Sequence, residues 1–288
     1  MSKVSATTSI VLGIFAMLGY GVEDVIAKTM LSNRNAIRIA VVSQTIGTVL
    51  FLAVALTYDL ALPSSTIICL ALISGVVSAF VLSSYYLALS LGKASIVSPM
   101  FSCMSVVAVV LSLWILGESL TSLQLSLISL VFAGILLVAF EKSETKDSAH
   151  KSSVLLALLA ALLGGGGIII QKWIAESSHY LMAFVFSRIF MISFMLPISP
   201  LIRETPPVIT SRMYVKLGIL GLMDVSAFFC WYIGLRIGLV SIVTPIVLSS
   251  PAVTVALAHI FLKERVRLHQ RLGILAVVAG IVLLSAIS

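Results

Sequence analysis

The stretch GKASIVSPMFSCMSVVAVVLSLWILGE, Gly92 to Glu118, has a similar counterpart in the second half of the chain. The counterpart is GLVSIVTPIVLSSPAVTVALAHIFLKE, Gly238 to Glu264. The two copies align without a gap at an offset of 146 residues, and Ser98 meets Thr244, which keeps the hydroxyl group. The identical pairs include Gly92/Gly238, Ser95/Ser241, Ile96/Ile242, Val97/Val243, Pro99/Pro245 and Glu118/Glu264. Such an internal repeat predicts one structural unit that occurs twice in the chain.

The composition around this repeat is typical of a membrane protein. Of the 288 residues, 60% are hydrophobic and 10% are charged, and the mean hydropathy is +1.19. Soluble domains carry about 25% charged residues, so this chain could not cover a surface that faces water. The net charge of +7 comes from basic residues in short loops, where they meet anionic lipid headgroups. We therefore expect membrane lipids, and no nucleic acid, as partners.

The apolar stretches are about 20 residues long, which is the length that a helix needs to cross ~30 Å of hydrocarbon. The longest polar run, Glu141 to Ser153, divides the chain into a first repeat at 1–140, a linker at 141–151 and a second repeat at 152–288. We predict ten helices, at Ser9–Leu31, Ala36–Thr57, Ser64–Leu89, Lys93–Leu116, Ser122–Phe140, Ser152–Ala175, Tyr180–Leu201, Met213–Leu235, Leu239–Leu262 and Gln270–Ala286.

Five helices in each repeat is an odd number, so the second repeat enters the membrane from the opposite side. The predicted fold is an all-α integral membrane protein with ten transmembrane helices, arranged as two inverted five-helix repeats around a central cavity. Inverted repeats recur in secondary transporters, whose substrate site lies near the midplane. We expect a multi-pass protein of the cell (inner or plasma) membrane.

Two tracts carry a family resemblance. The tract ASIVSP…WILGESLTSLQLSLISLVFAGILLV and its twin VSIVTP…PAVTVALAHIFLKERVRLHQRLGILAVVAGIVLL resemble the EamA-type repeat of the drug/metabolite transporter superfamily. The first half departs from that pattern, because it has Ser105 where the second has Pro251. The resemblance implies a ten-helix carrier that exports or exchanges small metabolites, with both termini in the cytoplasm.

The distribution of basic residues predicts the opposite orientation. The face that carries the termini has only Lys3 and Arg236, and cytoplasmic loops carry the excess of Lys and Arg. The charge bias therefore places both termini outside, against the implication of the resemblance. The thirteen basic residues of the other face are Arg34, Arg38, Lys93, Lys142, Lys146, Lys151, Arg203, Arg212, Lys216, Lys263, Arg265, Arg267 and Arg271.

The first helix contains charged residues at membrane depth, where a charge normally lines a cavity or has a partner. Glu23 and Asp24 are adjacent, so a helix turns them about 100° apart and they should face different surroundings. Asp24 can pair with Lys28 four residues later, which leaves Glu23 without a local partner. Glu23 shares a face with Tyr20, and we expect the two to line a substrate site where Glu23 binds a cation, a substrate amine or a proton.

In the second half, Arg188 lies too deep in its helix to reach the interface easily. A guanidinium group binds a carboxylate or phosphate through two hydrogen bonds, so Arg188 could hold an anionic group of a substrate. The alternative is a structural ion pair with Asp224, and the two need not exclude each other. Gln44 follows Lys28 by the same sixteen residues that separate Arg188 from Lys172. We expect Gln44 and Asp224 at the site, and Lys172 at the membrane interface.

Aromatic and hydroxyl side chains complete the predicted site. Tyr86 and its repeat mate Tyr232, together with Trp231, could form a substrate wall; ordinary packing is the alternative for each ring. The hydroxyl groups of Ser98 and Thr244 are expected to line the cavity. The adjacent Pro99 and Pro245 each remove a backbone hydrogen bond and are predicted hinges.

These observations favour a secondary transporter of small metabolites, with amino acids as the preferred cargo, that works by alternating access. Export of drugs or lipophilic cations is the alternative, and an intramembrane enzyme fits less well because the four histidines have no H-x-x-x-H spacing and GxSxG is absent. We expect no enzyme activity, no cofactor and no metal. The expected partners are a small-molecule substrate and a coupling ion such as a proton, and a homodimer is left open.

Overall fold

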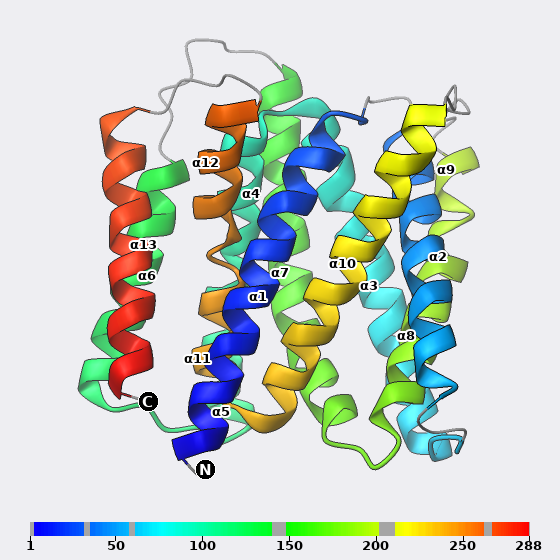
Figure 1. Ribbon diagram of the computed structural model, residues 1–288, viewed down its shortest axis with the longest axis horizontal. Coiled ribbons are helices and arrows are strands. Elements are labelled where there is room, and N and C mark those ends of the chain that lie inside the picture. The colour runs from blue at the N-terminus through cyan, green and yellow to red at the C-terminus, as the bar shows by residue number, and fades with distance from the viewer. Residues whose placement is uncertain are drawn as a thin grey trace.

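The computed structural model describes residues 3–31, 35–57, 61–139, 148–201, 211–261 and 267–287. The first half contains α1 (Lys3–Lys28), α2 (Ala36–Ala55), α3 (Ser65–Leu91), α4 (Ala94–Ser102), α5 (Met104–Ile115) and α6 (Ser122–Ala139). The second half contains α7 (Ser148–Ala175), α8 (Tyr180–Met195), α9 (Ile198–Leu201), α10 (Ser211–Ile237), α11 (Val240–Val247), α12 (Ser250–Phe261) and α13 (Leu268–Ile287). All secondary structure in the described ranges is helical (Figure 1).

Seven helical segments of the described chain are long and apolar enough to cross a membrane. Three further apolar helices are shorter, at Ser122–Val138, Tyr180–Met195 and Leu268–Leu284. Together they correspond in position to the ten predicted segments. The all-helical membrane fold is thus confirmed, whereas ten complete crossings stay a prediction because three of the helices are short for the hydrocarbon thickness.

The proline-containing segments are each divided into two helices. Pro99 lies within α4, which ends at Ser102, and Pro245 lies within α11, which ends at Val247. The interruptions therefore follow the prolines by one helical turn. All of α11 is buried, in agreement with the rule that irregular backbone at membrane depth is tolerated inside the protein. Hinge motion at these prolines stays a prediction.

Contacts between the halves follow an inverted pattern. Helix α1 packs along α10, and its counterpart α7 packs along α3. A Cβ atom added at Gly21 of α1 would lie 2.5 Å from Val253 of α12, and one added at Gly165 of α7 would lie 2.4 Å from Val107 of α5. Glycine at these equivalent positions allows the helices to approach closely. The first helix of each half therefore packs against helices of the other half.

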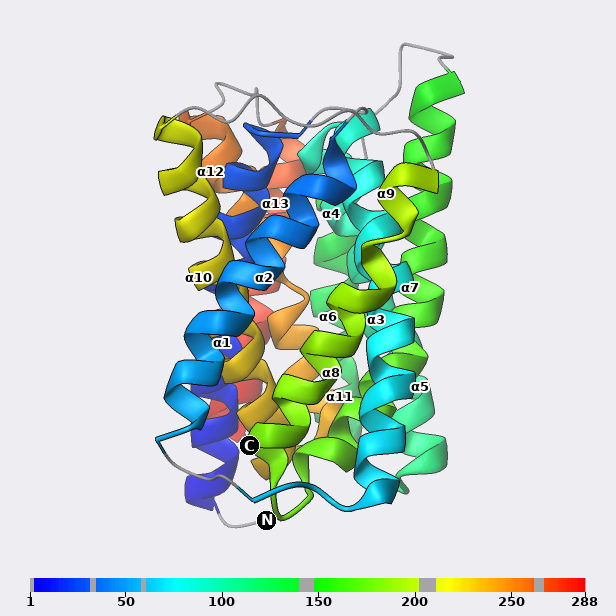
Figure 2. The same ribbon diagram turned by 90° about the vertical axis from the view of Figure 1, so that its right-hand side faces the viewer.

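The ends of the chain agree with this inversion. Both termini lie at one end of the molecule, where α1 begins, whereas α7 begins at the opposite end (Figures 1 and 2). Some of the residues that set the charge bias lie outside the described residues, namely Arg34, Lys142, Lys146, Arg203, Lys263 and Arg265. The membrane orientation and the repeat boundaries stay predictions.

The outer surface is apolar. Large hydrophobic side chains such as Trp114, Phe261 and Leu155 expose 82%, 70% and 69% of their area. Soluble monomers rarely expose contiguous apolar patches of more than a few hundred Å², so a surface of this kind suits contact with lipid. Several buried polar side chains, Glu23, Asp24 and Arg188 among them, line the cavity described next.

Candidate functional site

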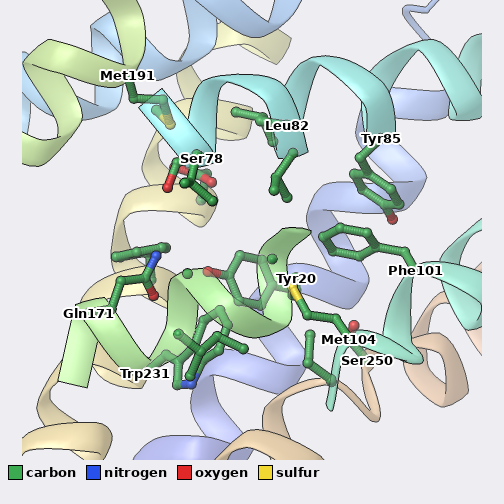
Figure 3. Close-up of a pocket in the computed structure, with 18 of the residues that line it drawn as sticks. Tyr20, Ser78, Leu82, Tyr85, Phe101, Met104, Gln171, Met191, Trp231 and Ser250 are labelled. Atoms are coloured by element: carbon green, nitrogen blue, oxygen red, sulfur yellow. The ribbon is translucent and has the colours of Figure 1, made fainter. Parts of the chain in front are cut away.

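A cavity of about 110 Å³ lies between the two halves (Figure 3). Its walls come from α1, α3, α7, α8 and α10, with further residues from α4, α5 and α12. The predicted site residues found in these walls are Tyr20, Glu23, Arg188, Asp224 and Trp231. The expectation of a central cavity built by both halves is therefore met by the geometry.

Asp24 is one of the most constrained side chains in the cavity wall. Its carboxylate accepts hydrogen bonds from the hydroxyl groups of Tyr85 at 2.5 Å, Ser98 at 2.6 Å and Thr254 at 2.9 Å. These donors belong to α3, α4 and α12, so Asp24 joins α1 to helices of both halves. The predicted ion pair with Lys28 is wrong, because the Lys28 ammonium group donates to carbonyl oxygens at the end of α3.

Glu23 also lines the cavity, although it neighbours Asp24 in the sequence. The expectation that the adjacent carboxylates of Glu23 and Asp24 face different surroundings is wrong, because both residues line the same cavity. Glu23 exposes 6% of its area and accepts a hydrogen bond of 3.0 Å from the Tyr86 hydroxyl group. Its partner thus comes from α3 and not from its own helix. Tyr86 does not line the cavity, and its link to the site is the hydrogen bond that it donates to Glu23.

Arg188 lies at the centre of a cluster that joins α8 to α10 and α2. It forms an ion pair with Asp224 and donates to the side-chain oxygen of Gln44. Its guanidinium carbon lies 4.8 Å from the ring centroid of Phe228 and 5.5 Å from that of Phe184. The ion pair between Arg188 and Asp224 is confirmed. Gln44 lies beside this pair and accepts a hydrogen bond from Arg188. Contact of Arg188 with a substrate stays a prediction.

Lys172 does not extend to the membrane interface. It exposes 9% of its area, and its ammonium group donates to the carbonyl oxygens of Leu235 at 2.6 Å and Gly238 at 3.0 Å. It also lies 2.9 Å from the carboxylate of Glu176. The interfacial prediction is wrong because the end of α10 supplies unpaired carbonyl oxygens within reach of the side chain.

Aromatic rings form two parts of the cavity wall. Tyr20 and Trp231 meet edge to face with centroids 6.2 Å apart, and Tyr85 stacks on Phe101 at 4.1 Å. Tyr232 lies elsewhere, in the wall of a smaller adjoining chamber of about 20 Å³. The two chambers share Ser78, Gln171, Arg188, Met191 and Phe228.

Two predicted hydroxyl groups are placed differently from one another. Ser98 reaches the site through its hydrogen bond to Asp24. Thr244 is fully buried and is not among the residues of the cavity wall, so its contact with a substrate stays a prediction.

Several wall residues were not predicted from the sequence. Gln171 of α7, Ser78 of α3 and Met191 of α8 line both chambers, and Met104 and Ser250 line the main cavity. Gln171 is detectable in principle, because it is an uncharged polar residue inside the apolar run GGGGIIIQKW. Ser78 and Ser250 carry no such signal, since serine is common in membrane helices.

The charged groups in the wall are three carboxylates, of Glu23, Asp24 and Asp224, and one guanidinium group, of Arg188. Buried charges in a low dielectric need partners of opposite sign or hydrogen bonds. The described residues contain no cluster of His, Cys, Asp and Glu with the arrangement of a metal site. The wall of the cavity therefore contains more carboxylate side chains than basic ones.

Known proteins resemble this chain in sequence and in fold. An uncharacterized protein of Methanocaldococcus jannaschii is 34% identical over 133 residues, which cover 46% of this chain and 96% of that protein. A solved crystal structure superposes with a TM-score of 0.76 at 15% identity and covers 98% of both chains. The model of the EamA-like transporter family matches residues 7–140 and again residues 151–286. The chain therefore belongs to the EamA-like transporter family.

Proposed function

We propose that the protein is a secondary carrier that moves small amine-bearing metabolites, amino acids and related compounds among them, across the cell membrane by alternating access. The single observation that carries this proposal is the excess of carboxylate side chains in the wall of the cavity between the two halves. Membership of the EamA-like transporter family supports transport across a membrane.

The charges favour a positively charged group of the substrate. Arg188 balances Asp224, and Asp24 receives three hydroxyl donors. Glu23 receives one hydroxyl donor, from Tyr86. Because an unpaired buried carboxylate is costly, Glu23 is the group that gains most from a ligand ammonium or a proton. A coupling proton and a substrate amine would then compete for the same carboxylate.

Amino acids and lipophilic cations differ in what they require from Arg188. A substrate carboxylate would have to compete with Asp224 and Gln44, because both terminal nitrogens of the guanidinium group are engaged. Its third nitrogen, Nε, is buried without a partner. A lipophilic cation needs no anion site and would use the aromatic walls at Tyr20, Trp231 and Phe101. It is the second candidate cargo.

We propose that a route runs from the two chambers toward the end of the molecule that carries the termini. Beyond the small chamber, the rings of Tyr180 and Tyr232 stack with centroids 6.4 Å apart. Arg236 lies 4.0 Å over the Tyr180 ring and donates to the carbonyl oxygens of Ala175 and Ser177. An outer hollow of about 510 Å³ is lined by Ile67, Ser177 and His179 among others, and Ser177 is one of the residues to which Arg236 donates. We assign the layer of Tyr180, Tyr232 and Arg236 as a gate on this route and call it the aromatic gate.

A thermal-shift screen of the purified protein against amino acids, organic cations and phosphorylated metabolites tests the proposal. Amine-bearing compounds should raise the melting temperature, and the same compounds should exchange across liposomes that contain the protein. Stabilisation by phosphorylated anions alone would contradict it.

A further inference from the structure

The cavity wall contains a buried amide side chain whose oxygen has no hydrogen-bond partner among the described residues. Gln171 exposes 8% of its area, and its side-chain oxygen has no hydrogen-bond partner. Buried polar atoms in native proteins are nearly always paired with protein groups, water or a ligand. Since Gln171 lines both chambers, its missing partner is expected to come from the cavity.

The Tyr20 hydroxyl group faces this amide from the other half of the protein. Figure 3 shows the Gln171 amide and the Tyr20 hydroxyl group directed toward one another across the cavity. Tyr20 lies on α1 and Gln171 on α7, which are the first helices of the two halves. The Tyr20 ring is held edge to face by Trp231 at 6.2 Å, so its hydroxyl group has a defined direction.

The pair carries no formal charge, which limits what it can bind. An amide and a hydroxyl group can each donate and accept a hydrogen bond. Their best ligand is therefore a neutral group that does both, such as an amide or a hydroxyl group. A carboxylate can only accept hydrogen bonds, so the acceptor oxygen of Gln171 would stay unpaired. It would also add a negative charge to a cavity that already holds three carboxylates and one guanidinium group.

The subsite and Glu23 belong to the same cavity. Tyr20 precedes Glu23 by about one helical turn on α1, and Tyr20, Glu23 and Gln171 all line the cavity, so one small molecule can contact the three of them. The cavity of about 110 Å³ is somewhat smaller than the ~150 Å³ cavity that accepts benzene in another protein. A molecule that fills this cavity alone is thus about the size of benzene or isoamylamine, and a larger one such as leucinamide extends past Gln171 into the adjoining chamber of about 20 Å³.

We propose that Gln171 and Tyr20 form a subsite for a neutral amide or hydroxyl group of a substrate whose ammonium group binds Glu23. The proposal rests on the carrier function proposed above and narrows its substrate class. It favours amines with a neutral polar group over zwitterionic amino acids.

Three related probes test this subsite: leucinamide, leucine and isoamylamine. They share the branched body and differ only in the second polar group, which is an amide, a carboxylate or absent. Dissociation constants are measured by calorimetry on the wild-type protein and on Gln171→Leu and Tyr20→Phe. Tyr214→Phe is the matched control, because Tyr214 is 62% exposed and lies outside the cavity.

Wild-type protein should bind leucinamide more tightly than leucine or isoamylamine. Each cavity variant should lower the preference for leucinamide over isoamylamine about fivefold, as expected for one hydrogen bond, and Tyr214→Phe should keep it. Gln171→Leu should also melt at a higher temperature without ligand, because it removes an unpaired buried oxygen. Since Tyr20→Phe keeps the ring packing, loss of folding is not an expected outcome.

Two results would overturn the subsite and leave the carrier function in place. One is an equal effect of the cavity variants on leucinamide and isoamylamine; the other is tighter binding of leucine than of leucinamide in the wild-type protein. If the wild-type protein binds none of the three amines, the proposed function fails and the subsite fails with it.

Discussion

Lys28 and Lys172 perform the same task in opposite halves of the protein. Each ammonium group donates two hydrogen bonds to carbonyl oxygens at the C-terminal end of a long helix in its own half. The acceptor residues are repeat mates, Leu89 and Gly92 for Lys28 and Leu235 and Gly238 for Lys172. The duplication seen in the sequence is thus also a duplication of individual contacts.

Lys172→Met should destabilise the protein by about 1–3 kcal/mol, because the last carbonyl oxygens of α10 lose buried donors and the helix dipole loses a cation. Reversible unfolding in mixed micelles measures the free energy. Lys151→Met is the control, since Lys151 is an exposed residue of the same helix. Equal stability of the two variants would show that the Lys172 contacts contribute nothing.

Removal of either partner of the Arg188–Asp224 pair should cost about 3–5 kcal/mol, because an unpaired charge is left in the interior. The double variant Arg188→Met, Asp224→Leu should be more stable than the variant that carries Asp224→Leu alone, since it leaves no buried charge unpaired. The same unfolding measurement on the four proteins gives the coupling energy. Additive effects of the two changes would contradict a direct ion pair.

The aromatic gate predicts a difference in thiol reactivity, measured after replacement of the native Cys69, Cys103 and Cys230. Ser178→Cys, at an exposed residue of the outer hollow, should react rapidly with a polar thiosulfonate. Ser74→Cys, at a residue that is 1% exposed and lines the small chamber, should react slowly.

Adding Tyr232→Ala should speed the reaction of Ser74→Cys about tenfold, because a stacked ring pair is worth about 0.5–1.5 kcal/mol beyond its area. The rate for Ser178→Cys should stay the same and serves as the control. If Tyr232→Ala leaves the reaction rate of Ser74→Cys unchanged, the route does not pass the aromatic gate.

The architecture was predictable because it depends on periodicity and length. The repeated stretch and the odd number of apolar segments per half indicate inversion, and the packing of α1 on α10 and α7 on α3 follows that pattern. The helix interruptions after Pro99 and Pro245 also follow from the repeat.

The contacts of single side chains were less predictable, because they depend on which helix lies opposite. Asp24 takes donors from three other helices and not from Lys28, and no local spacing indicates this. Lys172 is long enough to reach either the interface or a helix end, and the position of α10 decides between them. Gln171 was missed because its significance lies in an unpaired oxygen, which a sequence does not display.

The most direct test of the central claim is the uptake of radiolabelled isoamylamine and leucine into proteoliposomes by the wild-type protein and by Glu23→Gln. Glutamine keeps an oxygen for the Tyr86 hydroxyl group and removes only the charge. Uptake of the amines should fall at least about tenfold, because two charges 4 Å apart near a protein surface interact by about 4 kcal/mol. Glu176→Gln, outside the cavity and 51% exposed, should transport like the wild type. Equal uptake by wild-type protein and Glu23→Gln would contradict a carrier that recognises its cargo through an acidic cavity.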